Sequence, residues 1–174
     1  MQLRISTLLL SFLCAFQLSG QEAEISFKIK NAGIYVDGIF DSIQVIQQFD
    51  PQELSSANFD VTIPVTTIDT GINARDRHLM KSKYFDVENY PEIRFQSTSL
   101  EQRETRYQLK GNLNIKETTL AVAIDFDLET KEGKLYYVGS LELDRRDYGV
   151  GKNHLILGDI VKIMIQVPVE NPGI

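Results

Sequence analysis

Three polar residues close together, Arg75, Asp76 and His78, form the part of the sequence best suited to acid–base chemistry. A histidine changes its charge near neutral pH, and a neighbouring carboxylate can orient it as a general base. The same group could also contact a polar head group at one end of a fold. We favour a third interpretation, in which Arg75 and Asp76 form a structural clamp of hydrogen bonds that holds an inserted segment in place.

Other signatures of catalysis are absent from the sequence. No serine lies in a Gly-x-Ser-x-Gly turn, and the single cysteine, Cys14, lies in an N-terminal apolar run. His78 and His154 are far apart and lack the spacing of paired metal ligands. We therefore expect no catalytic residues, no metal site and no enzymatic activity. An enzyme that uses His78 with Asp76 is the weakest of three hypotheses.

The run Asp144-Arg145-Arg146-Asp147 carries two charges of each sign. One of its cations could lie near an anionic lipid head group. A run of balanced charge is more typical of a solvated loop at the end of a strand, where exposed ion pairs contribute little. We expect the solvated loop.

The first 20 residues have the features of a secretory signal peptide. Arg4 is their only charged residue, residues 5–16 are almost all apolar, and Leu18-Ser19-Gly20 forms a small-residue exit. The apolar run is too short to span a membrane as a helix. We expect export to the periplasm or out of the cell, with cleavage before Gln21.

Residues 21–174 then form one domain, which is long enough to bury a substantial core. The full chain has a net charge of −6, and loss of Arg4 makes the remaining domain more acidic. An acidic domain without a basic stripe lacks the phosphate contacts that supply most nucleic-acid affinity, so nucleic acid is not an expected partner. A lipid anchor on Cys14 is not expected either, because the large Leu13 precedes it.

Most of this domain alternates between apolar and polar residues with a period of two. Such alternation is typical of strands with one apolar and one wet face, and short turns such as Lys131-Glu132-Gly133 separate the segments. The pattern predicts an all-β, antiparallel, up-and-down, lipocalin-like barrel, although a β-sandwich has the same local pattern. The alternating segments are 25–29, 34–40, 59–65, 107–115, 120–128 and 161–169.

Residues 71–91 interrupt the alternation. They contain one or two turns of expected helix around residues 74–82, and Pro91 then opens the next strand. A lone helical insertion in a barrel usually covers one end. We expect Leu79 and Phe85 to close that end.

The expected inner faces carry aromatic and aliphatic side chains, with Gly38, Gly111 and Gly139 between them. Bulky and absent side chains on one face can leave a cavity, whereas glycines that mark strand bends are compatible with a packed core. The pattern leaves both open. The side chains that we expect to line a cavity and bind an apolar ligand are Phe27, Ile29, Val36, Phe40, Val61, Ile63, Leu79, Phe85, Phe95, Leu113, Ile124, Phe126 and Tyr137.

The stretch 68–97 contains Ile-Asp-Thr-Gly, Arg-Asp-x-His-Leu, Tyr-Phe-Asp-Val and Tyr-Pro-x-Ile-x-Phe-x-Ser. This block resembles the signature of the YceI-like, polyisoprenoid-binding proteins. The resemblance extends through Gly38-Ile39-Phe40, residues 110–115, residues 146–150 and Asp159-Ile160-Val161. Asn31 and Ala32 stand where the family commonly has a histidine, and Glu117-Thr118-Thr119 stands where it usually has Gly-x-Thr.

The resemblance implies an exported, lipocalin-like barrel with a long apolar pocket for isoprenoid lipids or quinones, and no catalysis. Our first hypothesis is therefore a carrier that holds a polyprenol or a quinone and needs no other cofactor. The second hypothesis is an extracytoplasmic stress-response or interaction protein with a filled barrel and no lipid ligand. Neither hypothesis fixes the oligomeric state, and a dimer is compatible with both.

Overall fold

The computed structural model describes residues 23–153 and 155–170. These residues form one antiparallel β-sheet of ten strands. The expected signal peptide, residues 1–20, and His154 lie outside the described residues. The strands are β1 (Glu24–Asn31), β2 (Ile34–Phe40), β3 (Gln44–Gln48), β4 (Asn58–Pro64), β5 (Ile68–Asp69), β6 (Glu92–Arg103), β7 (Arg106–Ile115), β8 (Thr118–Lys131), β9 (Lys134–Asp144) and β10 (Leu157–Pro168). The helices are α1 (Asn73–Leu79) and the 3₁₀ segments η1 (Leu54–Ser56), η2 (Val65–Thr67) and η3 (Arg145–Tyr148).

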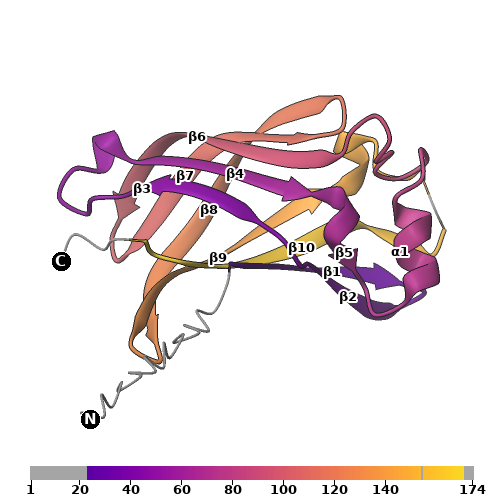
Figure 1. Ribbon diagram of the computed structural model, residues 1–174, viewed down its shortest axis with the longest axis horizontal. Coiled ribbons are helices and arrows are strands. Elements are labelled where there is room, and N and C mark those ends of the chain that lie inside the picture. Colours follow the sequence, from indigo (N-terminus) through magenta and orange to yellow (C-terminus); the bar gives the residue numbers. More distant parts are fainter. Residues whose placement is uncertain (1–22, 154, 171–174) are drawn as a thin grey trace, which may run out of the picture.

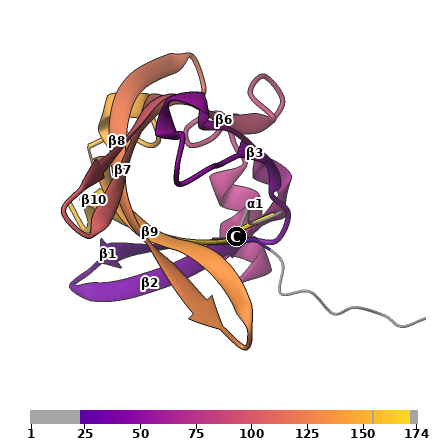
Figure 2. The same ribbon diagram turned by 90° about the vertical axis from the view of Figure 1, so that its left-hand side faces the viewer.

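The sheet curls into a barrel (Figures 1 and 2). Its strands follow the order β3-β4-β6-β7-β8-β9-β10-β1-β2-β5, so the first strand of the chain pairs with the last. The prediction of an all-β antiparallel barrel with a short helical insertion is confirmed, and the β-sandwich alternative is wrong. The sheet forms a single layer that wraps around its own apolar face.

Tight hairpins connect the long strands. Glu132 and Gly133 both have positive φ, 50° and 79°, between β8 and β9. Two consecutive residues in this region match the right-handed twist of the flanking strands, and glycine adopts it without a steric penalty. The turn expected at residues 131–133 is therefore a two-residue hairpin.

The sheet begins at β3 and ends at β5, and within the described residues no continuous ladder of strand pairing joins these two edge strands. Two local contacts close the barrel instead. Near one end, β5 pairs with β2 at Ile39 and Phe40. Near the other, the Gln47 side chain on β3 donates to the carbonyl of Pro168 (2.9 Å) and accepts from the N–H of Glu170 (3.2 Å). These side-chain bonds tie β3 to the end of β10.

Helix α1 lies at one end of the barrel, on the right in Figure 1, and the loop of residues 49–57 lies at the other. We name these the α1 end and the β3–β4 end. The helix ends earlier than the predicted residue 82, because the N–H groups of Phe85 and Val87 return to bind the carbonyls of Leu79 and Met80. In the part of the chain that the structure describes, no helix is long and apolar enough to cross a membrane.

The period-two pattern predicted the inner faces well but failed at some strand ends. Phe59, Ile63 and Phe126 point inward and are buried, as expected. Ile34 has the same parity as the inward residues of β2, yet it is 73 % exposed. It is the first residue of β2, directly after the hairpin, where the strand has passed the rim of the barrel.

Candidate functional site

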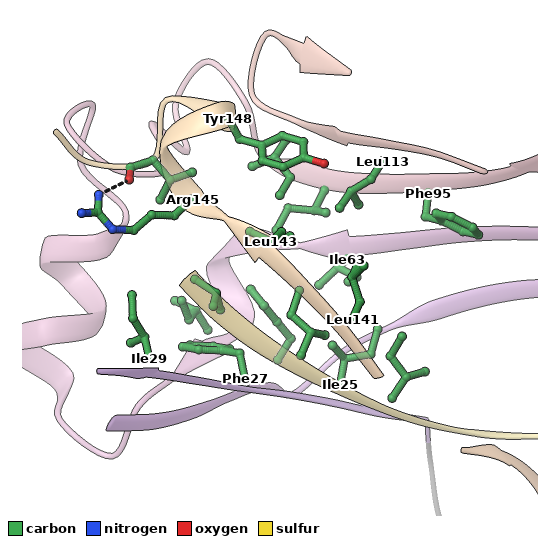
Figure 3. Close-up of a pocket in the computed structure, with 18 of the residues that line it drawn as sticks. Ile25, Phe27, Ile29, Ile63, Phe95, Leu113, Leu141, Leu143, Arg145 and Tyr148 are labelled. Carbon is green, nitrogen blue, oxygen red and sulfur yellow. Dashed lines mark hydrogen bonds between the residues drawn. The ribbon is translucent and has the colours of Figure 1, made fainter. Parts of the chain in front are cut away.

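A cavity of about 260 Å³ lies inside the barrel. Figure 3 shows Phe27 from β1, Ile63 from β4 and Leu141 from β9 around the same space. Its wall is almost entirely apolar because each strand turns its apolar face inward. The interior is therefore hollow. The sequence was compatible with either a cavity or a packed core, and the structure has the cavity.

The cavity is lined from all around the barrel. Phe95 on β6 and Ile124 on β8 line it and are buried. Leu141 on β9, Ile163 on β10 and Phe27 on β1 line it from other strands and are half-buried.

All thirteen residues that the sequence assigned to the cavity lie on its wall, from Phe27 on β1 to Tyr137 on β9. Leu79 and Phe85 line it from the α1 end, as expected. That they bind a ligand stays a prediction. Residues on the wall that the sequence analysis did not assign include Ile25, Val45, Leu109, Leu141, Ile163 and Ile165. Their inward parity was the signal that could have found them.

Five rings pack together near the β3–β4 end, and we call them the aromatic cluster: Phe49, Phe59, Tyr107, Phe126 and Tyr137. Tyr137 is at its centre, with ring centroids 5.3 Å from Phe59, 5.4 Å from Phe126 and 5.5 Å from Phe49, all in edge-to-face geometry. Such contacts stabilise beyond the area they bury. Phe59, Phe126 and Tyr137 line the cavity, whereas Phe49 and Tyr107 lie behind them. The cluster therefore forms a two-layered wall.

The Tyr137 hydroxyl is the one buried side-chain polar atom without a hydrogen-bond partner among the described residues. Burial raises the pKa of this phenol well above its usual range, and the nearby negative charge of Glu170 raises it further. The hydroxyl is therefore neutral at physiological pH. An unpaired buried hydroxyl costs free energy, so the cluster holds this ring by packing alone.

Arg75 and Asp76 both bind Thr70, the residue that follows β5. The Arg75 Nε donates to Thr70 Oγ1 (2.7 Å) and its Nη2 donates to the Thr70 carbonyl (2.6 Å). Asp76 is buried, and its Oδ1 accepts from the Thr70 N–H (3.0 Å). This arrangement matches the structural clamp that we favoured. Thr70 and Arg75 also line the cavity, together with Asn31, so polar groups are present at the α1 end of its wall.

His78 does not lie on the cavity wall. It is exposed, and its ring centroid lies 5.0 Å from that of Tyr84, a buried residue that lines the cavity. The structure therefore separates His78 from the apolar interior where a substrate would bind. Among residues 23–153 and 155–170, no group of three or more histidine, cysteine or carboxylate side chains could hold a metal ion.

Arg145 is a correction to the expected solvated loop. It is 3 % exposed, and its guanidinium donates to the carbonyls of Gly158 (2.9 Å), Val150 (2.9 Å) and Lys152 (3.2 Å). It also pairs with Asp159 at 3.0 Å. A planar fork of five donors can satisfy several carbonyls at once. Arg145 thus fixes the segment that returns to β10, and part of its side chain lines the cavity (Figure 3).

The inward glycines do not open the cavity by leaving gaps, which was one of the two interpretations that the sequence left open. At Gly38 and Gly111, an added Cβ atom would overlap the rings of Phe27 and Phe95. At Gly139 it would come within 2.8 Å of the Asp125 carbonyl oxygen. Neighbouring groups already occupy these places, so the glycines permit close approach along the wall.

The sequence was compared with known proteins. Residues 16–169 match the family model for the YceI-like domain. The chain is 33 % identical over 118 residues to a UPF0312 protein of Photorhabdus laumondii, a match that covers 67 % of this chain and 61 % of that protein. It is 32 % identical over 114 residues to a UPF0312 protein of Pectobacterium atrosepticum, covering 65 % and 59 %. The matched region thus spans about three fifths of these curated relatives.

Two solved structures show the same fold. BcnA of Burkholderia cenocepacia superposes with a TM-score of 0.79 at 22 % identity, covering 85 % of this chain and 96 % of that one. A structure described as a polyisoprenoid binding domain from Saccharophagus degradans gives a TM-score of 0.61 at 10 % identity, covering 83 % and 91 %. With the family match over residues 16–169, these findings establish that the chain belongs to the YceI-like domain family.

Proposed function

We propose that this protein is an exported, non-enzymatic carrier that holds an isoprenoid-type lipid, a polyprenol or a quinone, inside its barrel. The observation that carries the proposal is the apolar cavity of about 260 Å³ inside the barrel. An apolar chain that binds there would transfer its surface from water to apolar side chains. This transfer stabilises the complex by about 25 cal/mol per Å² of apolar surface buried.

Two further observations support a lipid ligand. The Saccharophagus degradans domain, which has a similar fold, is described as polyisoprenoid binding. The polar wall groups Asn31, Thr70 and Arg75 lie at the α1 end, where they can contact the polar head of an amphipathic ligand. The inner wall offers an apolar surface to the tail.

A catalytic function has less support. The hypothesis depended on His78 with Asp76, and these side chains do not act as a pair on the cavity wall. Asp76 is engaged by Thr70 and His78 is exposed. A bound lipid would therefore meet apolar side chains and the clamp, and we propose binding without chemical conversion.

Export is part of the proposal and rests on residues 1–20. Their basic start, apolar run and small-residue exit are typical of a secretory signal peptide. We propose that the barrel acts in the periplasm or outside the cell, where a hydrophobic molecule needs a protein to cross the aqueous phase.

The experiment is native mass spectrometry of the protein purified from its own host, followed by thermal denaturation with added ligand. We expect a co-purified isoprenoid lipid or quinone. We also expect the thermal midpoint to rise with ligand concentration, because a ligand that binds only the folded state stabilises it by about 2.7 kcal/mol at 100 times Kd. Repeated ligand-free preparations, with no midpoint shift from quinones or polyprenols, would refute the proposal.

A further inference from the structure

We infer that the aromatic cluster sets the length of the apolar chain that the barrel accepts. The inference rests on the proposed function, since it concerns the same cavity. It assigns a specificity-determining role to Tyr137 and to Phe49 behind it. The ligand class that follows is an isoprenoid whose buried part is short.

The first step is the size of the cavity. A cavity of about 150 Å³ is enough to hold the six carbons of benzene, which corresponds to roughly 25 Å³ for each non-hydrogen atom. On that scale the present cavity of about 260 Å³ holds on the order of ten non-hydrogen atoms, or about two isoprene units. A longer chain has to leave the remainder outside the wall or move part of the wall.

The second step is which boundary can move. At the α1 end, Arg145 is bound to the carbonyls of Gly158 and Val150, and Asp76 is bound to Thr70. The side walls are paired strands. The backbone of these boundaries yields only if hydrogen bonds are broken.

The aromatic cluster is held differently. Phe49 belongs to no strand and is half-buried. It packs edge-to-face against Tyr107 and Tyr137, with ring centroids 5.6 and 5.5 Å away. Among the residues that the structure describes, none gives the Tyr137 hydroxyl a hydrogen bond that would keep its ring in place. The Tyr137 ring lines the cavity near the β3–β4 end, and Phe49, which does not line the cavity, packs against it.

The test compares three alcohols, geraniol, farnesol and geranylgeraniol, which contain two, three and four isoprene units. Their dissociation constants are measured by displacement of a fluorescent apolar probe from the wild-type protein and from Tyr137→Ala. In the wild type, we expect affinity to stop rising beyond geraniol or farnesol. In Tyr137→Ala, we expect geranylgeraniol to gain at least tenfold relative to geraniol, because the extra units enter the space that the ring occupied.

Phe49→Ala is the second variant, since Tyr137→Ala removes a central ring and could fail to fold. It leaves the wall intact but removes the ring that packs behind Tyr137. We therefore expect length preference to change in the same direction, with a smaller gain in affinity for geranylgeraniol. Leu54→Ala is the matched control, because Leu54 lies in the same loop and is half-buried but does not line the cavity. We expect it to keep the wild-type length preference.

The outcomes separate the two proposals. If wild-type affinity climbs with every added unit and both variants show the same dependence on length, the cluster does not set the length, although the barrel still binds isoprenoids. If affinity levels off with chain length in the wild type but both variants keep the same length preference, the inference is also overturned. If none of the three alcohols binds the wild type, the proposed function itself is wrong.

Discussion

Phe27 and Gly38 are direct cross-strand partners on β1 and β2, and the far edge of the phenyl ring occupies the place of the missing side chain at Gly38. The ring therefore leans along the wall of the barrel. The Phe95 ring on β6 fills the corresponding place at Gly111 on β7, although it reaches it diagonally, because the direct partners there are Phe95 with Leu113 and Ser97 with Gly111. Aromatic residues thus contribute apolar surface to the cavity without crossing it, and this explains how a barrel rich in phenylalanine remains hollow.

Gly38→Ala tests this packing. The added methyl group would overlap the ring of Phe27, so we expect the free energy of unfolding to fall by about 1–3 kcal/mol, the usual cost of overpacking. Urea denaturation measures the loss. Phe27→Leu in the same chain should relieve the overlap, so the double variant should lose less than the sum of the two single changes. Strict additivity would show that the ring does not depend on the glycine.

Arg145 offers a second prediction. Arg145→Met leaves the buried carbonyl of Val150 and the half-buried carbonyl of Gly158 without this donor, and we expect a loss of about 3–5 kcal/mol in the free energy of unfolding. Arg145→Lys should not restore stability, since one ammonium cannot reach all of these acceptors. Arg146→Met is the control, because its side chain is exposed, and we expect a much smaller loss. Similar losses in the two methionine variants would contradict the structural role of Arg145.

The same residue shows where sequence reasoning stopped. Period-two alternation predicted the inner faces, because one side of each strand must leave water, and it therefore found the eleven assigned wall residues that lie on strands. Leu79 and Phe85 were assigned from the expected helical insertion instead. Arg145 lies in a run of balanced charge that has no such signal, and its burial depends on carbonyls from residues 150–158 that only the fold brings together. Phe49 was missed for a similar reason, since it lies in a loop with no periodic pattern.

The clamp provides a third prediction. Asp76→Ala removes the acceptor of the Thr70 N–H, so we expect residues 71–91 to lose protection in amide hydrogen exchange by about 1.5–3 kcal/mol. Affinity for an isoprenoid alcohol should change far less, because Asp76 does not line the cavity. Arg77→Ala, an exposed change on the same helix, is the control. Unchanged protection of 71–91 with abolished binding would show that Asp76 contacts the ligand instead.

Acid stability gives a fourth prediction. Hydrogen bonds from the Arg146 side chain lower the pKa of Asp144 to about 2, from an ordinary value of 3.8. The stabilisation is therefore complete above about pH 4 and is lost as the pH falls through about 2. With allowance for solvent screening, Asp144→Asn should remove about 1 kcal/mol of this pH dependence. The free energy of unfolding is measured by urea titration between these pH values for the wild type and for Asp144→Asn. Equal losses of stability in the two proteins as the pH falls would contradict the assignment.

The most direct test of the central claim asks whether the ligand binds inside the barrel. Ile163 is half-buried on β10, opposite Phe27 and Leu141, and lines the cavity, whereas the next residue, Met164, is 40 % exposed. Ile163→Trp fills the hollow and Met164→Trp adds the same bulk on the other face of the strand. We expect Ile163→Trp to retain the β-sheet circular dichroism spectrum but to bind geraniol at least tenfold more weakly, while Met164→Trp binds it like the wild type. Undiminished binding by a folded Ile163→Trp protein would contradict the account, because the ligand would then lie elsewhere.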